Sequence, residues 1–458
     1  MKIKKEGENE IKTGIKSGIK SGGMSKRGNE NNSKIKTEIK SGIKNDDVSK
    51  GSNKSSNESD NESSNENSNG SMKNNDSGSG LVTAAFLVAL FILTIILEQV
   101  ISVASPMAML LTVLKKGSIY ALVAVSMNLL NGFTGLFSLG QAGFMLIGAY
   151  TYAIFTIPAV ERIDVYKYYD PAIYFSFPEV LENVLGGFGT LLGVIIAIII
   201  AGMAAALMAF LIGLPVLRLK SDYLAIATLG FAEIIRAIFQ WGGLGPITNG
   251  SNPLRSYVRL NAFELQMGGV SLQLTTLFPM VISAASIGII VLLVNSSYGR
   301  AFKAIREDEV AAEAMGINLY KHKQLSFCVS SFFAGVGGAL LAMFAGTVQA
   351  NNFKAAMTYE ILLIVVLGGI GSISGSCIGT MLFIAASEWW LRGLDTGSFL
   401  GINAPQIFRN GFRLVVFSII IMSVVLFFRR GMMGDKELPF VIKRRWERVK
   451  GSLRESRS

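Results

Sequence analysis

Long apolar runs alternate with short polar segments over most of this chain. Each run is close to the roughly 20 residues with which an α-helix crosses a bilayer, and charged residues gather between the runs and at both ends of the chain. A helix satisfies its own backbone hydrogen bonds in lipid. The pattern predicts an all-α, polytopic membrane bundle of about ten transmembrane helices, with eight to eleven as the range. The runs are 82–98, 106–131, 137–157, 188–214, 222–240, 274–295, 325–347, 358–374, 377–393 and 411–428.

The two ends of the chain differ from this apolar middle. Residues 1–80 are mainly Lys, Ser, Asn, Gly and Glu, with isoleucines in a degenerate Ile-Lys-Ser-Gly repeat. Such a composition cannot build a core, so we expect a disordered polar and basic extension. It does not follow the order of a signal peptide. The transmembrane domain should then cover 81–430, followed by a basic tail at 431–458.

The basic residues predict the orientation of the bundle. Ten spans would place both termini on one side, and the basic segments 218–220, 299–323 and 429–457 fall on that same side. Loops rich in Lys and Arg face the cytoplasm. We therefore expect a multi-pass protein of the cell membrane, plasma or inner, with both termini in the cytoplasm. Lys115 and Lys116 do not follow this pattern, because they fall within or before the second span.

Composition narrows the chemistry. Half of the residues are hydrophobic and 16% are charged, and the net charge of +11 comes from tails and loops, so it indicates membrane topology rather than nucleic-acid binding. The two cysteines and the single histidine show no metal-ligand spacing. No Gly-x-x-x-x-Gly-Lys-Ser/Thr phosphate loop is present, so the sequence predicts no ATP site of its own. We expect neither a metal nor a cofactor nor a catalytic residue.

The charged segment 299–318 lies between two apolar runs and has the spacing of an amphipathic helix. Gly316 follows the last periodic residue, where a left-handed conformation can end the helix. One continuous helix in a basic loop would offer a docking surface to a soluble partner, and a solvated helical loop is the alternative. Its apolar residues, which can share one face, are Phe302, Ile305, Ala312 and Met315.

Two clusters of small residues interrupt apolar runs. Small residues allow close helix packing, and they also allow a helix to unwind where protein or water can satisfy its backbone. A pair of broken helices typically brackets a transport site. Tight packing without substrate contact is the alternative, and the turn near Gly371 could be re-entrant. The first cluster contains Gly132, Gly135, Ser138, Gly140 and Gln141, and the second contains Gly368, Gly369, Gly371 and Ser372.

Carboxylates within the apolar runs are a further sign of function, because ionised groups at membrane depth need partners or water. Glu233 lies three residues before Arg236, so the two can pair on one helix face. Glu360 lies near a predicted span end, and Glu388 lies within a span. On the side opposite the basic loops, the aromatic-rich loop 158–187 could receive a partner or form a lid on the helix ends.

Several ordered motifs together resemble the LivM-type permease subunit of branched-chain amino acid ABC importers. They cover nearly everything from about 106 to 430, and the N-terminal extension lies outside the resemblance. The matching segments are Leu-Leu-Asn-Gly-Phe-Thr-Gly at 129–135, 138–142, 148–150, 223–234, 299–301, 306–309, 311–318 and Val-Leu-Gly-Gly-Ile-Gly-Ser at 366–372.

The resemblance implies a transport subunit that is not itself an enzyme. Its expected partners are a second permease of the LivH type, two cytosolic subunits that hydrolyse ATP, an external substrate-binding protein and membrane lipid. It also implies that loop 296–324 is the coupling loop, whose pattern is Glu-Ala-Ala, three residues, Gly. Ala311, Ala312 and Gly316 match this pattern, whereas Val310 replaces the glutamate and Glu309 stands one place early.

Two other functions stay open from the sequence. A related permease for urea or short amides would carry the same motifs. A secondary transporter driven by an ion gradient would use Glu233 or Glu388 as its proton site. The motifs do not define the substrate.

Overall fold

A computed structural model describes most of the apolar part of the chain. The N-terminal extension 1–80, the predicted spans 82–98 and 411–428, and the tail 431–458 lie wholly or mostly outside the described residues. Those residues are 91, 94–95, 98, 108–219, 221–262, 264–267, 270–390, 398–399, 402–403, 418–419, 422 and 431–434.

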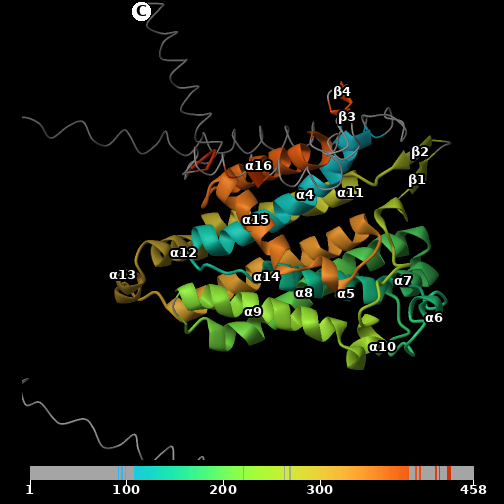
Figure 1. The fold of residues 1–458 in the computed structure, drawn as a ribbon, viewed down its shortest axis with the longest axis horizontal. Helices are drawn as coiled ribbons and strands as arrows, with labels where there is room; N and C mark the ends of the chain where they lie inside the picture. Colours follow the sequence, from blue (N-terminus) through green and yellow to red (C-terminus); the bar gives the residue numbers. More distant parts are fainter. Residues whose placement is uncertain are drawn as a thin grey trace, which may run out of the picture. The chain divides into compact units, whose positions relative to one another are not determined.

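Helices form almost all of the described structure (Figure 1). Five of them are long and apolar enough to cross a membrane, and the bent pair α15–α16 provides a sixth candidate span. The predicted helical membrane bundle is therefore confirmed. The longer helices are α4 (Ala108–Asn128), α5 (Gln141–Thr156), α8 (Gly187–Val216), α9 (Ser221–Gln240), α11 (Leu277–Asn295), α14 (Leu319–Ala345), α15 (Ala355–Gly368) and α16 (Ile373–Ala385).

Shorter elements complete the loops and include two small antiparallel hairpins. In the first hairpin Glu264 lies opposite Gln273 and Met267 opposite Val270. The short elements are η1 (Leu129–Phe133), α6 (Arg162–Val165), α7 (Phe177–Leu185), η2 (Gly242–Leu244), α10 (Gly245–Thr248), η3 (Leu260–Ala262), β1 (Glu264–Met267), β2 (Val270–Gln273), α12 (Ser297–Glu307), α13 (Glu309–Ala314), η4 (Ala350–Asn352), η5 (Ala386–Trp390), β3 (Ser398–Phe399) and β4 (Ile402–Asn403).

Glycines bring the central helices into close contact. Helix α14 packs against both α5 and α8. A Cβ added at Gly148 of α5 would collide with the backbone carbonyl of Gly335 in α14, and one added at Gly338 would collide with that of Met145. Only small residues let membrane helices approach so closely. The short helix α5 reaches about 24 Å at 1.5 Å per residue, so the predicted span 137–157 becomes helical only from Gln141.

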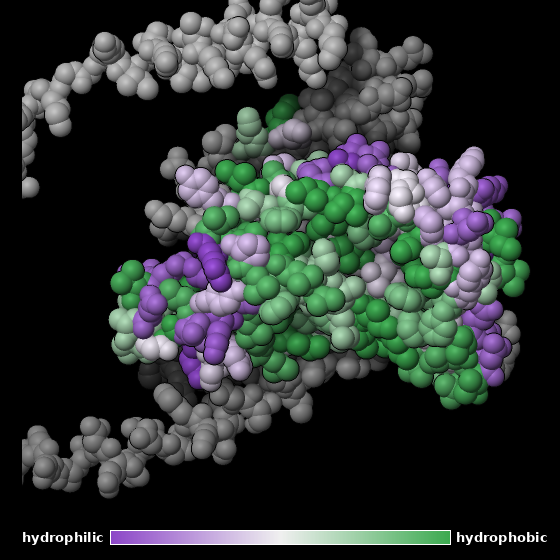
Figure 2. Space-filling view, turned by 90° about the horizontal axis from the view of Figure 1, so that it is seen from below, coloured by the Kyte–Doolittle hydropathy of each residue, from purple (hydrophilic) through white to green (hydrophobic). Residues whose placement is uncertain are grey.

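The polar elements gather at opposite ends of the helices. Helices α12 and α13 lie at one end, and α6, α7, α10 and the β1–β2 hairpin lie at the other (Figure 1). Figure 2 shows hydrophobic residues over the middle of one face and hydrophilic residues towards both ends. This distribution suits a bundle whose middle faces lipid.

The aromatic-rich loop 158–187 packs on the end of α5. The fully buried guanidinium of Arg162 donates hydrogen bonds to four backbone carbonyls, those of Ile154 (2.8 Å), Phe175 (2.7 Å), Ile157 (3.2 Å) and Ile173. Four acceptors for one donor group explain how a charge is buried here.

A second contact joins this loop to the neighbouring loop. Burial raises the pKa of Tyr166 to about 12, so its hydroxyl stays protonated and donates to the carbonyl of Ile247 at 2.7 Å. Of the two functions left open for loop 158–187, a lid on the helix ends agrees with both contacts.

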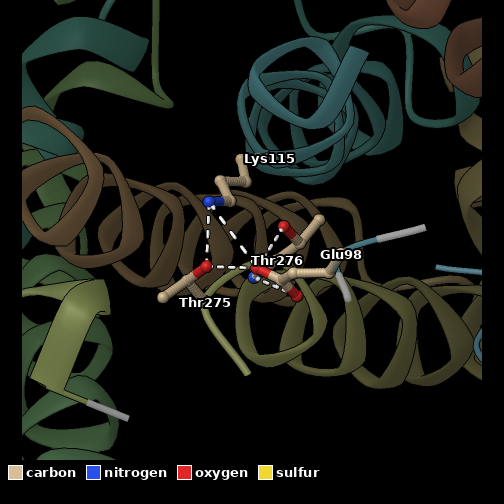
Figure 3. Close-up of polar contacts among 4 residues, drawn as sticks. All are labelled: Glu98, Lys115, Thr275 and Thr276. Atoms are coloured by element: carbon tan, nitrogen blue, oxygen red, sulfur yellow. Dashed lines mark hydrogen bonds and ion pairs between the residues drawn. The ribbon is translucent and has the colours of Figure 1, made fainter. Parts of the chain in front are cut away.

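Lys115 and Lys116, the two exceptions to the charge pattern, have partners inside the bundle. Lys116 pairs with Glu388 at 2.5 Å. The Lys115 ammonium donates to Thr275 Oγ1 at 2.9 Å and lies 3.8 Å from Glu98 Oε1 (Figure 3). The pairing explains why the lysines do not have to lie in a basic loop.

The buried carboxylate of Glu98 also accepts from the hydroxyl of Thr275 and from the backbone N–H of Thr276 at 3.1 Å. It therefore lies at the N-terminus of α11, where unpaired N–H groups favour a negative charge.

We predict that Arg162→Met destabilises the lid. Each buried carbonyl left without a donor costs about 1–3 kcal/mol, so the melting temperature in detergent should fall and proteases should cleave loop 158–187 faster. Lys167→Met removes an exposed charge from the same loop and should change neither measurement. Equal melting and cleavage for the two variants would show that the four hydrogen bonds are not needed.

Candidate functional site

The charged segment is two helices rather than the single continuous helix predicted from its periodicity. Asp308 separates α12 from α13, with φ −157° and ψ 115°. Its carboxylate accepts from the N–H groups of Val310 (2.8 Å) and Ala311 (3.0 Å), which caps the start of α13. Aspartate at this position stabilises a new helix start more than it stabilises a helix interior.

The break at Asp308 changes which residues face the bundle. Phe302, Ile305 and Ala312 are buried, as the amphipathic pattern predicts. Met315, predicted to share their face, is 83% exposed, and Val310 is 78% exposed. The prediction for Met315 is wrong because α13 begins in a new direction. Val310 near the start of α13 and Met315 just after its end are thus two apolar side chains exposed to the surroundings.

Gly316 ends α13 in the left-handed conformation that its position suggests, with φ +84°. The N–H of Gly316 donates to Glu313 O at 2.9 Å, and that of Ile317 donates to Ala312 O at 3.1 Å. These two bonds satisfy carbonyls that the end of a helix leaves free. The tight turn fixes the direction in which the chain leaves for α14.

Glu309 connects α13 to the rest of the bundle. Its carboxylate pairs with Lys323 of α14 at 2.6 Å. The acid that stands one place early in the coupling pattern therefore has a partner within its own chain. Among the matching residues, Ala312 is buried, whereas Ala311 and Gly316 are exposed.

The first glycine cluster interrupts the chain between α4 and α5. Helix α4 continues into the π-helical turn η1, and residues 135–140 form no helix or strand. Gly135 has φ +75°, a conformation that favours glycine. The Asn131 side chain accepts from the N–H of Ser138 at 3.2 Å across the break. Gln141 begins α5, and its amide donates to Ser126 Oγ at 2.8 Å.

The second cluster forms a sharp turn between α15 and α16, whose axes differ by 119°. Gly369 and Gly371 have φ of +118° and +89°, so both favour glycine. Ser372 caps α16 by accepting from the N–H of Gly375 at 3.1 Å. At Gly368, an added Cβ would collide with the carbonyl of Gly375, which keeps the two arms of the turn in contact.

The structure brings the two clusters together through Asn128, the last residue of α4. Its amide donates to Ser372 O at 2.9 Å and to Ser376 Oγ at 2.8 Å, and its carbonyl oxygen accepts from Gly371 N–H at 2.8 Å. Asn128 is fully buried. A Cβ added at Gly132 would collide with this side chain and lie 2.6 Å from Gly371 N. We call the two interrupted segments, together with Asn128, the break junction.

Helix α12 contacts the break junction directly. The Arg306 guanidinium donates to the carbonyl of Gly132 at 2.8 Å. Lys303 lies over the ring of Phe133, 5.7 Å from its centre, within the range of a cation–π interaction. The chain between the amphipathic segment and the first cluster is long, so the sequence did not reveal this contact. The sequence does place a polar residue, Asn128, within an apolar run, and a polar residue at such a position indicates a buried polar contact.

Glu233 lies apart from the break junction. It pairs with Arg236 at 2.7 Å, as the spacing of three residues predicts. Its other oxygen accepts from the N–H of Ala355 at 3.2 Å, at the start of α15. Glu233 therefore joins α9 to α15. Within the part of the chain that the structure describes, no group of three His, Cys, Asp or Glu residues is placed to hold a metal ion.

We predict that Gly132→Ala destabilises the bundle. The added methyl group meets backbone and the buried Asn128 amide, and overpacking of this kind costs about 1–3 kcal/mol. The melting temperature in detergent should fall by several degrees. Gly288→Ala on α11 is the matched control, because nothing lies within 4 Å of its added Cβ. If both variants melt like the parent, the break junction is not closely packed.

Comparisons with known proteins find related sequences over most of the chain. A family model described as "Branched-chain amino acid transport system / permease component" matches residues 109–427. The permease protein LivM of the high-affinity branched-chain amino acid transport system of Escherichia coli is 31% identical over 335 residues, covering 68% of this chain and 69% of LivM.

More distant relatives agree. LivM of Methanocaldococcus jannaschii, a probable branched-chain amino acid transport permease, is 23% identical over 58% of this chain and 76% of its own length. BraD of Pseudomonas aeruginosa is 25% identical over 70% of this chain and 94% of BraD. No solved structure matches the chain significantly. The family match over most of the chain, the LivM relatives and the helical membrane bundle together place this chain in the family of branched-chain amino acid transport system permease components.

Proposed function

We propose that this permease carries branched-chain amino acids as one subunit of an ABC importer. Its relatives in Escherichia coli and Pseudomonas aeruginosa are named as high-affinity branched-chain amino acid permeases. A permease of the LivH type would pair with it, because LivH proteins are also similar to this chain. Two ATPase subunits in the cytosol and an external substrate-binding protein would complete the importer.

The coupling loop 296–324 would face the cytoplasm, together with both termini, as its basic residues favour. ATP bound by the ATPase subunits would bring those subunits together and push on α13. The exposed apolar side chains of Val310, near the start of α13, and Met315, just after its end, suit a groove on such a subunit. Glu309 and Lys323 would keep α13 fixed to α14 as it moves.

The hydrogen bond from Arg306 to Gly132 is the observation that carries this proposal. This bond joins α12 to a segment whose helix is already interrupted. A displacement of α12 would therefore move the break junction directly. Helix α12 also follows α11 and contacts α14. Movement at the loop would thus open and close the path beside the broken helices.

A transporter driven by an ion gradient receives less support. Its expected proton sites were Glu233 and Glu388, and each forms an ion pair, with Arg236 and Lys116 respectively. Each acid therefore already has a basic partner among the described residues. Among the described residues we find no contact that favours urea or a short amide over an amino acid.

We predict that the double substitution Val310→Asp and Met315→Asp disrupts docking of the ATPase subunits. Charged side chains would replace the two exposed apolar side chains of this segment, so co-purification of ATPase subunits with the permease should fall at least tenfold. Val184→Asp, on exposed α7 at the opposite end, should leave it unchanged. Undiminished co-purification with the double variant would contradict docking through α13.

We predict that Arg306→Ala separates ATP hydrolysis from transport. The ATPase subunits should still bind and hydrolyse ATP, while leucine import into proteoliposomes falls at least tenfold, because the link to Gly132 is lost. Arg300→Ala on the same helix removes a guanidinium that bonds to Ser297 and should import normally. Import by Arg306→Ala at the parent rate would rule out this route of coupling.

A further inference from the structure

A cavity of about 470 Å³ lies between α4, the end of α14 and the start of α15. Its size falls within the range of small-molecule sites, about 300–1,000 Å³. One wall is the segment 347–354, which follows α14 and includes η4. The exposed Asn351, Asn352 and Lys354 on this wall connect the cavity to the surface of the chain.

Although one wall is a connecting segment, part of the cavity lies beside the middle of a membrane-length helix. The N–H of Ala355, which lies between the lining residues Lys354 and Ala356, donates to Glu233, the thirteenth residue of α9. That position is about 18 Å along a helix of about 30 Å at 1.5 Å per residue. Charged residues at such a depth are expensive in lipid and mark substrate paths.

Two opposite charges in the cavity, Lys354 and Glu360, form no side-chain hydrogen bond or ion pair among the described residues, and the nearby charge of Lys116 acts on Glu360 without direct contact. Lys116 is held by Glu388 at 2.5 Å. By contrast, within the described ranges neither Lys354 nor the half-buried Glu360 forms a hydrogen bond or ion pair through its side chain. They are six residues apart on or beside α15, about 9 Å along its axis. A carboxylate and an ammonium at this spacing can hold the two ends of a zwitterion.

The remaining lining is mostly apolar and suits an aliphatic side chain. It includes Leu341, Phe344, Val348, Phe353 and Met357. We propose that this cavity is the membrane site for the transported amino acid: Glu360 binds its ammonium group, Lys354 binds its carboxylate, and the apolar wall around Met357 receives its side chain. The assignment rests on the proposed function and adds the residues that recognise the substrate.

The test measures tritiated leucine binding to the purified full chain in lipid nanodiscs, without any substrate-binding protein. Leucine should compete, while leucinamide, which lacks the carboxylate, and 4-methylpentanoate, which lacks the ammonium, should each need at least tenfold higher concentrations. Glu360→Gln and Lys354→Gln should each weaken leucine binding at least tenfold. Met357→Trp, which fills the cavity, should abolish it.

The two leucine analogues test which residue binds which charged group of leucine. Glu360→Gln should no longer discriminate against 4-methylpentanoate, and Lys354→Gln should no longer discriminate against leucinamide. Glu182→Gln and Lys321→Gln, both exposed and outside the cavity, are the charge-matched controls and should bind leucine like the parent. Absence of leucine binding by the parent chain, or parent-like affinity and selectivity in both cavity variants, would overturn the assignment.

Import by the reconstituted complex separates this inference from the proposed function. If the complex imports leucine with ATP and both cavity variants import at the parent rate, the site is wrong and the function stands. If the parent complex imports no branched-chain amino acid, the proposed function fails. If the variants lose the second permease subunit while leucine binding persists, Glu360 and Lys354 form a subunit interface, and the site is again overturned.

Discussion

Where a helix is interrupted inside a membrane, its free backbone N–H and C=O groups need hydrogen-bond partners in the protein, because lipid offers none. Asn128 meets this constraint in the described structure. One amide satisfies groups at Gly371, Ser372 and Ser376, all in the turn between α15 and α16, while belonging to the helix that leads into the other interruption. The two interruptions therefore form one unit, and Gly132 has to be small so that they can meet.

Helix α4 connects the break junction to the cavity. Asn128 lies eight residues after Tyr120 and twelve after Lys116, so the break junction is about 12–18 Å along the helix from the two cavity residues of α4. Arg306 contacts the junction from α12, on the side where the charged helices lie. A helix with the loop contact at its end and the charged cavity at its middle can pass a displacement between them.

Local patterns predicted much of this arrangement. Apolar runs predicted the helical bundle, and a spacing of three residues predicted the pair of Glu233 and Arg236. The contact between Asn128 and Ser372 joins residues 244 positions apart, and no local period encodes such a pairing. The sequence did not predict the exposure of Met315 for a different reason. Asp308 can either continue a helix on its solvent-exposed face or cap the start of a new helix. Only its extended backbone in the structure shows that it caps a new one.

The turn after α15 is completed by a distant part of the chain. The N–H groups of Met432 and Met433 donate to the carbonyls of Leu367 (2.9 Å) and Gly368 (3.2 Å), which the end of α15 would otherwise leave without partners. A ribosome makes residue 432 more than 60 residues after residue 368. During synthesis, these two carbonyls therefore gain the partners that the structure shows only after residues 432 and 433 have been made.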